Sequence, residues 1–450
     1  MRTGGRSLVI YVLLAAAAAG LVAFFVLKRS KTRVEAPALA AGAPENAPPQ
    51  RTLPPLPARP LSPRMKQLRA RAMESASRLR GLDWVGEVGM TELSGWEYGT
   101  RTKEIADVVA TDDLKGLSRL AVAGGMLPEG TDLASLAVTF TAATAGATYS
   151  PLDKQVLLVS EGPKGGRDSG LLTHEFVHAL QDQHFDLLDM MLVRPFDFDR
   201  EEALFALIEG DAMSVERRAA GGDAWAKLPL EEIARAEDNR FAPYRKGIGA
   251  LFPPLLTETF IFRYRDGLRF VEAMRRERPA VRIDDVFRRP PRSSEQVLHP
   301  EKYLADEAPR QISLNVEGFE DEGWRPAAST PLGEIGVRGL LLAGVPAEEA
   351  KRAAAGWGGD RSFVFEREGH DPLFVWRTTW DKPADAQEFY RAYNTLQQGR
   401  ATEAEQPSSQ QRVWREGRRL TLVLIEGDAV TIVRGAEEDA RDGLRLASAR

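Results

Sequence analysis

Apolar residues recur at the three-to-four-residue spacing of helices in two long parts of the chain, residues 65–125 and 255–277. Residues 137–161 differ, because β-branched residues are enriched on both sides of a Ser-Pro-Leu-Asp-Lys turn, which predicts a hairpin or strand pair. Consecutive prolines in residues 288–303 stop any helix there and predict a loop. Up to about residue 331, the pattern is therefore mainly helical with a small sheet.

From about Leu332 the pattern changes to one in which strands dominate. It predicts three strands, at residues 361–368, 372–380 and 419–435. It also predicts a helix at residues 382–396, between the second and third strands. No repeat of fixed period is present in the sequence. The sequence therefore predicts an α+β fold with two domains, residues 65–331 and residues 332–450.

The N-terminal part predicts a membrane anchor followed by a linker. Leu8 to Leu27 is a run of twenty uncharged residues, which as a helix is about 30 Å long and matches a bilayer core. Basic residues directly after the run disfavour signal-peptide cleavage, so we expect residues 1–33 to remain as a transmembrane signal-anchor. Residues 34–64 hold nine of the 28 prolines and predict an extended linker. Basic residues on both sides of the span leave its orientation open.

Composition narrows the classes of partner and of metal site. The chain of 450 residues is 43% hydrophobic, which is enough for more than one core. Its net charge of −5 and the lack of a basic stripe argue against nucleic acid as a partner. The absence of cysteine excludes a disulfide framework and a thiolate metal site, so any metal must be held by His, Asp or Glu. The sequence does not indicate the oligomeric state.

Three of the five histidines lie within the stretch Thr173 to Phe185. His174 and His178 form an H-E-x-x-H pattern, and residues four apart on a helix share one face, so both imidazoles can bind one Zn²⁺. Glu175 lies one residue round the helix, beside the open coordination position, where a carboxylate can take a proton from a zinc-activated water. The pattern predicts a catalytic zinc site with Glu175 as the general base.

A third protein ligand is required, and His184 is the first of two candidates. His184 has the spacing of the metzincin signature, in which a glycine breaks the helix before the third histidine. Here Gln181 occupies the glycine position, and its neighbours favour a continuous helix. On such a helix His184 points about 120° away from His178 and cannot reach the same metal. We therefore expect His184 to be a structural or supporting residue.

Glu209 is the second candidate. Asp199 followed three residues later by Glu202 predicts a capped helix start, and an apolar face follows it. Glu209 comes just after this face, in the middle of the predicted helix. Next to an H-E-x-x-H helix, a carboxylate in this position is expected to be a ligand rather than a solvated residue. The sequence therefore favours His174, His178 and Glu209 as zinc ligands.

These motifs resemble those of the gluzincin branch of the zincin metallopeptidases. The chain shares H-E-x-x-H-A-L-Q-D-Q, E-G-D-A and the block Pro290 to Tyr303 with a broad group of largely uncharacterised bacterial proteins. The resemblance covers most of residues 65–450. It implies a zincin-like catalytic domain that holds zinc through the three ligands named above, with Glu175 as general base. It also implies a strand beside the cleft that pairs with an extended peptide, for which residues 154–161 are the natural candidate.

The sequence departs from the better-known gluzincin pattern at Met213, where thermolysin-like members place an Asp that orients a histidine. Asp182 and Asp211 are the candidates for that supporting role. Acyl transfer also needs a donor for the developing oxyanion. His299 and Tyr264 are the candidates, and both are expected to be substrate-binding residues.

Two functions are compatible with these features. The first is a membrane-anchored zinc metallopeptidase that hydrolyses a peptide or protein substrate, with its catalytic domain outside the cytoplasm, in the cell envelope or periplasm. The alternative is a catalytically inactive zincin scaffold that binds a partner in the cell envelope. Glu175 favours the enzyme, because a non-catalytic zinc site has no use for an acid beside its first ligand. His370 has no partner visible in the sequence and is expected on the surface.

Overall fold

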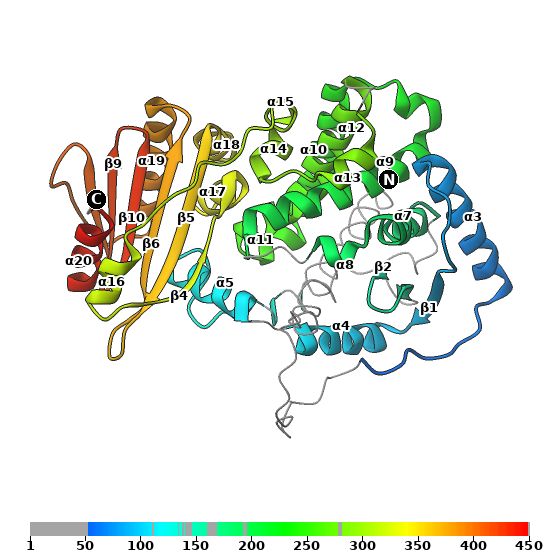
Figure 1. Cartoon of the computed structure of the whole chain (residues 1–450), viewed down its shortest axis with the longest axis horizontal. Helices are drawn as coiled ribbons and strands as arrows, with labels where there is room; N and C mark the ends of the chain where they lie inside the picture. The colour runs from blue at the N-terminus through cyan, green and yellow to red at the C-terminus, as the bar shows by residue number, and fades with distance from the viewer. Residues whose placement is uncertain are drawn as a thin grey trace, which may run out of the picture. The chain divides into compact units, whose positions relative to one another are not determined.

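The computed structural model describes residues 53–109, 112–133, 135, 136, 139, 146–159, 169–191, 196–277 and 281–448. Contacts divide the chain into two compact units, the first with residues 1–114, 134–192 and 215–225, and the second with 115–133, 193–214 and 226–450. The predicted membrane span and most of the predicted linker lie outside the described residues. Among the residues described, no helix is long and apolar enough to cross a membrane. Helices and strands together confirm the predicted α+β class (Figure 1).

The first unit contains a small mixed sheet. Its strands are β1 (Gly89–Leu93), β2 (Ala147–Ser150) and β3 (Gln155–Val159), in the order β1-β3-β2. β3 pairs with β1 in parallel and with β2 antiparallel, which confirms the strand pair predicted from the sequence. The prediction that residues 154–161 offer a free strand to a peptide is wrong, because β3 has a neighbour on each of its two edges.

The helices of the first unit are α3 (Pro63–Arg80), α4 (Gly95–Val109), α7 (Ser169–Phe185) and α8 (Leu187–Met190). The Ser62 side chain accepts a hydrogen bond from the Met65 N–H and caps α3, so this helix begins just before the predicted end of the linker. Helix α7 packs against α3 and β2 and is buried without interruption from Leu171 to Asp182. A helix buried on all sides carries its polar side chains into the core with it.

Helix α9 (Phe198–Ala226) is continuous across the boundary between the units, since its residues from Val215 onward belong to the first unit. The second unit also contains α10 (Leu230–Lys246), η3 (Ile248–Leu251), α11 (Pro254–Ile261), the π-helix η4 (Phe262–Asp266), α12 (Gly267–Glu277) and α13 (Ile283–Arg288). A Cβ on Gly210 of α9 would meet the backbone of Gly267, and one on Gly267 would meet the backbone of Ala206. The glycine that follows Glu209 is therefore needed for the close approach of α9 and α12.

The start of α9 differs from the prediction. The Asp197 carboxylate accepts a hydrogen bond from the Arg200 N–H, so Asp197 caps the helix and not Asp199. Asp199 is buried instead and accepts a hydrogen bond from the Ser294 N–H. Asp197 and Asp199 both lie close to the start of α9, and the local sequence pattern does not show which of the two caps the helix.

The predicted loop 288–303 is also partly wrong. It contains two short helices, α14 (Ser294–Leu298) and α15 (Pro300–Leu304). The Ser293 side chain accepts from the Gln296 N–H and starts α14, while a proline in its first turn starts α15. The prolines before Ser293 therefore lie between α13 and α14, and they do not prevent a helix from starting after them.

The C-terminal part is an antiparallel sheet of seven strands in the order β4-β5-β6-β10-β9-β8-β7 (Figure 1). The strands are β4 (Arg325–Thr330), β5 (Trp357–Glu366), β6 (Leu373–Trp380), β7 (Glu403–Glu405), β8 (Gln411–Glu416), β9 (Arg419–Glu426) and β10 (Ala429–Ala436). The predicted strands at 361–368 and 372–380 correspond to β5 and β6, and the segment predicted at 419–435 is the pair β9 and β10, whereas β4, β7 and β8 were not predicted. Because β4 pairs with β5, the sheet begins before Leu332, where the predicted domain starts.

Helices pack on both faces of this sheet. The helices are α16 (Val316–Asp321), α17 (Gly333–Leu341), α18 (Ala347–Ala354), α19 (Pro383–Gln398) and α20 (Glu437–Ser448). Side chains alternate along β6, so Val375 joins the core under α16 and α20, while Trp376 packs on Phe389 of α19. The predicted helix at residues 382–396 corresponds to α19.

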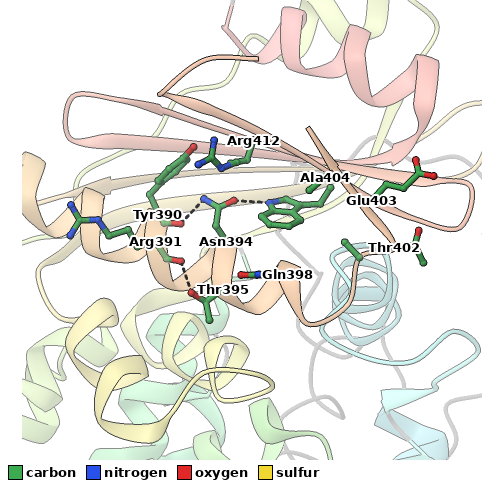
Figure 2. A pocket seen from close by; sticks show the side chains of 11 residues that line it. Tyr390, Arg391, Asn394, Thr395, Gln398, Thr402, Glu403, Ala404 and Arg412 are labelled. Carbon is green, nitrogen blue, oxygen red and sulfur yellow. Dashed lines mark hydrogen bonds between the residues drawn. The ribbon is translucent and has the colours of Figure 1, made fainter. Parts of the chain in front are cut away.

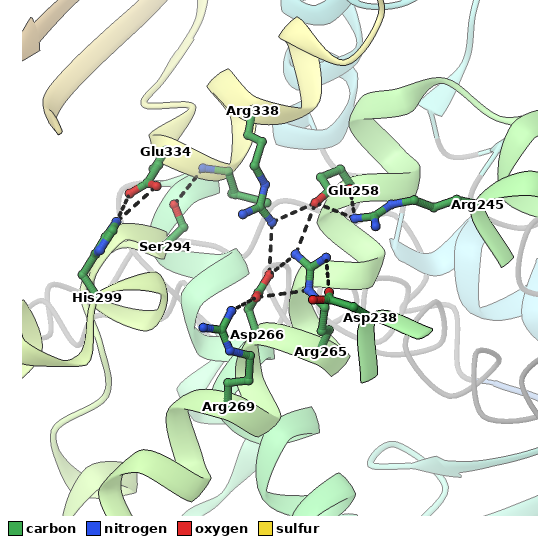
Figure 3. Close-up of polar contacts among 11 residues, drawn as sticks. Asp238, Arg245, Glu258, Arg265, Asp266, Arg269, Ser294, His299, Glu334 and Arg338 are labelled. Carbon is green, nitrogen blue, oxygen red and sulfur yellow. Dashed lines mark hydrogen bonds and ion pairs between the residues drawn. The ribbon is translucent and has the colours of Figure 1, made fainter. Parts of the chain in front are cut away.

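A buried ion network holds the helices of the second unit together (Figure 3). The Asp266 carboxylate, at the end of the π-helix, forms ion pairs with Arg265, Arg338 and Arg269, with N···O distances of 2.7, 3.0 and 3.3 Å. Arg338 of α17 also lies 2.8 Å from Glu258 of α11. Burial opposes ionisation, but the three arginines outweigh it and hold the pKa of Asp266 well below its ordinary value. Asp266 therefore stays ionised inside the core.

We expect Asp266→Asn to lower the free energy of unfolding at pH 7 by about 3–5 kcal/mol, because three arginines lose a buried partner. Since the folded-state pKa is depressed, this stabilisation is complete above the ordinary carboxyl pKa of about 4 and is lost as the pH falls below it. Urea unfolding between pH 7 and pH 3 measures both effects. Asp285→Asn, at an exposed pair, is the control, with an expected loss under about 0.5 kcal/mol. Equal losses in the two variants would contradict the role of the network.

Candidate metal centre

Helix α7 brings His174 and His178 together. The helix is continuous from Ser169 to Phe185, which confirms that no break follows the second histidine. The two Nε2 atoms lie 3.0 Å apart, and both side chains are buried. Two nitrogens bound to one zinc at about 2.0–2.1 Å lie roughly 3.3 Å apart, so this separation suits a shared ion.

Helix α9 supplies Glu209 to the same place. One ligand atom of each of His174, His178 and Glu209 lies within 4.8 Å of the other two, and all three residues are buried. Glu209 and Glu216 lie seven residues, or about two turns, apart on one unbroken stretch of α9. Two nitrogens and one carboxylate oxygen are zinc ligands that leave a fourth coordination position open, so the donor set fits a catalytic zinc ion.

The far side of each imidazole faces a fixed acceptor. His174 Nδ1 lies 3.3 Å from a carboxylate oxygen of Glu216, and His178 Nδ1 lies 2.9 Å from the amide oxygen of Gln181. An acceptor at Nδ1 holds the proton there and leaves Nε2 as the metal-binding atom. The Glu216 carboxylate is itself 2.8 Å from Arg217. Gln181 is thus a hydrogen-bond partner of His178, and Glu216 lies at ion-pair distance from His174.

Glu216 and Gln181 were not identified from the sequence, and the two acids that were expected in their place act elsewhere. Asp182 accepts from Tyr149 and Lys154, and Asp211 pairs with Arg275 at 2.9 Å. The sequence did contain a signal for Glu216, because it follows Glu209 by two helical turns on the same face. Here the orienting acid comes two turns after the ligand, whereas thermolysin-like proteins place it one turn after.

Arg263 is a further residue that the sequence did not indicate. It is buried in the π-helix and forms a two-point ion pair with Glu202, with N···O distances of 2.7 and 2.5 Å. Burial lowers the pKa of Arg263, but the carboxylate of Glu202, with a smaller contribution from that of Glu209, outweighs it. Arg263 therefore stays charged in the core, paired with Glu202.

Glu175 is fully buried, and strand β2 fixes its carboxylate. One oxygen accepts the Tyr149 N–H at 2.7 Å. The Tyr149 hydroxyl donates to Asp182 on the same helix at 2.7 Å, and Lys154 Nζ reaches the same Asp182 oxygen at 2.6 Å. Burial and then the charge of Asp182 raise the pKa of the Tyr149 hydroxyl, so it remains a donor. Strand β2 is therefore tied to α7 at two points, one of which is the predicted general base.

His184 lies apart from this group. It is exposed, and its Nε2 lies 2.7 Å from the carbonyl oxygen of Asp83. It is not among the residues whose ligand atoms meet at the site. The continuous helix turns His184 to another side, as its spacing predicts.

The two residues predicted to be oxyanion donors, His299 and Tyr264, have different neighbours in the structure. His299 lies between α14 and α15, with Nε2 3.0 Å from a Glu334 carboxylate oxygen. Burial opposes protonation of His299, but Glu334 outweighs it and raises the histidine pKa. Tyr264 is fully buried in the π-helix, where its ring packs on Phe260. Neither residue is a member of the three-residue ligand group.

His370 is exposed, which confirms the predicted surface position. It also has a partner that the sequence did not reveal. Its Nδ1 lies 3.0 Å from the Asp439 carboxylate, and its ring packs edge-on against Trp324. Asp439 follows 69 residues later in the sequence, which is why the pairing could not be inferred from the local pattern.

A second acidic group in the described residues consists of Glu295, Glu307 and Asp381. The ammonium of Lys302 lies among them, at 2.6, 2.9 and 2.7 Å respectively. A lysine in this position supplies the positive charge that a metal ion would otherwise bring. The group is therefore an ion-pair cluster and not a metal site.

Residues 323–445 match a family described as a domain of unknown function (DUF8575). The match begins two residues before β4 and covers the seven-stranded sheet, and it contains neither α7 nor α9. No curated protein and no solved structure matches the chain. The family match therefore concerns the C-terminal part alone and assigns no function to it.

We expect Tyr149→Phe to lower the free energy of unfolding by about 1.5–3 kcal/mol, because the buried Asp182 carboxylate loses a hydrogen bond. Tyr98→Phe is the matched control, since its hydroxyl bonds the neutral Thr148 hydroxyl at 3.1 Å and its loss should cost about 0.5–1.5 kcal/mol. Urea unfolding at pH 7 measures both variants. A loss in Tyr149→Phe no larger than that in Tyr98→Phe would contradict the coupling of β2 to α7 through Asp182.

Proposed function

We propose that this chain is a zinc-dependent metallopeptidase. The observation that supports this best is that ligand atoms of His174, His178 and Glu209 meet within 4.8 Å in a buried place. Two imidazoles and a carboxylate are donor types that a zinc ion takes in proteins. The orienting contacts of Glu216 and Gln181 further support the histidines as ligands.

Glu175 is the proposed general base. A zinc ion at the three ligands would polarise a substrate carbonyl and lower the pKa of a water molecule. Glu175 would take the proton of the attacking water and pass it to the leaving amine. The hydrogen bond from the Tyr149 N–H fixes one oxygen of the carboxylate, so the acid is held in one orientation next to the first ligand. This arrangement favours a catalytic function over a structural one.

His299 and Tyr264 remain the proposed substrate-binding residues. The raised pKa of His299 favours a protonated ring, which is the form that donates a hydrogen bond to an oxyanion. Tyr264 lies in a π-helical turn, a feature that often marks functional sites. These properties support donor roles for both side chains.

We further propose that residues 8–27 anchor the chain in a membrane and that the catalytic domain acts outside the cytoplasm, in the cell envelope. The support is the uncharged twenty-residue run and the proline-rich segment that follows it. The alternative function is an inactive zincin scaffold that binds a partner there. The buried, oriented Glu175 favours the enzyme over this alternative.

We expect the purified chain to carry about one zinc ion. Glu209→Ala should lose this ion and His184→Ala should retain it, because Glu209 is a proposed ligand and His184 is not. Metal content by mass spectrometry after purification without added metal is the measurement. Circular dichroism and thermal unfolding show whether each variant is folded. Zinc lost with His184→Ala, or a wild-type chain that takes up no zinc on titration, would refute the proposed site.

We expect Glu175→Gln to keep its zinc and to lose about 10²–10⁴-fold of the peptidase activity, because glutamine cannot accept the proton of the attacking water. Cleavage of a peptide library, followed by mass spectrometry, measures the activity of both chains. Glu104→Gln, at a partly exposed ion pair with Arg101, is the matched control and should retain full activity. If Glu175→Gln cleaves as fast as the wild type, Glu175 is not the general base.

A further inference from the structure

The C-terminal part contains a cleft between α19 and the last two strands of the sheet, β7 and β8 (Figure 2). Its volume is about 550 Å³, which is within the usual range for small-molecule sites. Its walls carry several polar side chains, namely Arg391, Asn394, Thr395 and Gln398 from α19 and Arg412 from β8. The cleft can therefore form hydrogen bonds with a ligand.

One end of the cleft holds hydrogen-bond donors that lack acceptors. Tyr390 is 5% exposed, and its hydroxyl has no hydrogen-bond partner among the described residues. Nη1 of Arg412 is also screened from solvent and has no such partner there. Figure 2 shows the hydroxyl and the guanidinium side by side. A buried donor without an acceptor costs about 1–3 kcal/mol, so a ligand that brings an acceptor to this end gains from both groups.

The neighbouring side chains do not supply that acceptor. Asn394 already holds two bonds, because its amide oxygen accepts from Trp414 at 2.6 Å and its amide nitrogen donates to the Tyr390 carbonyl at 2.7 Å. These two bonds fix the wall of the cleft between the helix and β8. The Tyr390 hydroxyl and Arg412 Nη1 therefore remain available to a ligand at this end of the cleft.

The charge of the cleft is positive. Among the described residues, no carboxylate pairs with Arg391 or Arg412, whereas Arg415, further along β8, pairs with Glu403 and Glu437. Glu403 is the acid that lines the cleft, and Arg415 neutralises it at 3.3 Å. Two guanidiniums without acidic partners in one cleft attract an anion.

We propose that this cleft binds a small anionic molecule whose carboxylate or phosphate group is held by Arg412 and Tyr390. The remaining polar groups, such as Thr395 and Gln398, would hydrogen-bond the rest of the ligand. Carboxylate and phosphate share the chemistry that the cleft offers, namely several acceptor oxygens and a negative charge. The site lies within the matched domain of unknown function and gives that domain a binding role of its own.

Isothermal titration calorimetry of the full chain at pH 7 with inorganic phosphate and with succinate tests the proposal. We expect at least one of the two anions to bind saturably with one site per chain. Arg412→Gln and Tyr390→Phe should each weaken that binding by about tenfold or more, because each removes a donor to the anion. Binding of phosphate alone would assign a phosphate site, and binding of succinate alone would assign a carboxylate site.

Two control variants distinguish the cleft from net charge and from the metal centre. Arg445→Gln removes an exposed charge on α20 and should bind like the wild type, since a specific contact does not depend on total charge. Glu209→Ala disables the proposed metal centre and should also bind like the wild type, because the cleft is a separate site. Tyr390→Phe removes only a hydroxyl, and its thermal unfolding shows whether the fold is kept. If neither anion saturates, or if folded Arg412→Gln and Tyr390→Phe bind as tightly as the wild type, the proposal is wrong.

Discussion

The burial of helix α7 is the constraint on which the candidate site depends. From Leu171 to Asp182 the helix is inside the protein, and His174, Glu175, His178 and Gln181 are buried with it. Buried polar groups need partners, so the surrounding elements are determined by these side chains. Strand β2 supplies a backbone N–H to Glu175, and α9 supplies Glu216 to His174. Glu209 of α9 lies beside the two histidines, with one ligand atom of each residue within 4.8 Å of the others.

The second unit meets the same constraint with ion pairs. Asp266 and Glu258 are buried among arginines, and Arg265 of the π-helix and Arg338 of α17 each contact both acids. Asp360 of β5 solves the problem differently, because it accepts hydrogen bonds from the indoles of Trp357 and Trp376 and from the backbone at the start of α17. In both cases a buried charge joins elements that are distant in sequence. This makes the packing of the helices specific, since a shifted helix would leave a charge without its partner.

The cleft beside α19 differs from its surroundings in the sheet. Arg415 and Arg434 each reach a carboxylate. At one end of the cleft, the Tyr390 hydroxyl and Arg412 Nη1 have no hydrogen-bond partner among the described residues. These two donors are the observation on which the proposed anion site rests.

The sequence by itself determined the strands β5, β6, β9 and β10, the helix α19, the α+β class and the three residues whose ligand atoms meet. Each depends on a local pattern: alternation along strands, and helical spacing that turns His184 away from His178. The tertiary structure alone decided the partners of these residues. Glu216, Arg263 and the N–H of Tyr149 met their partners only when the helices and β2 were packed together, whereas Gln181 contacts His178 within one helix. It also decided that β3 is the central strand, because strand order depends on long-range pairing that no local pattern encodes.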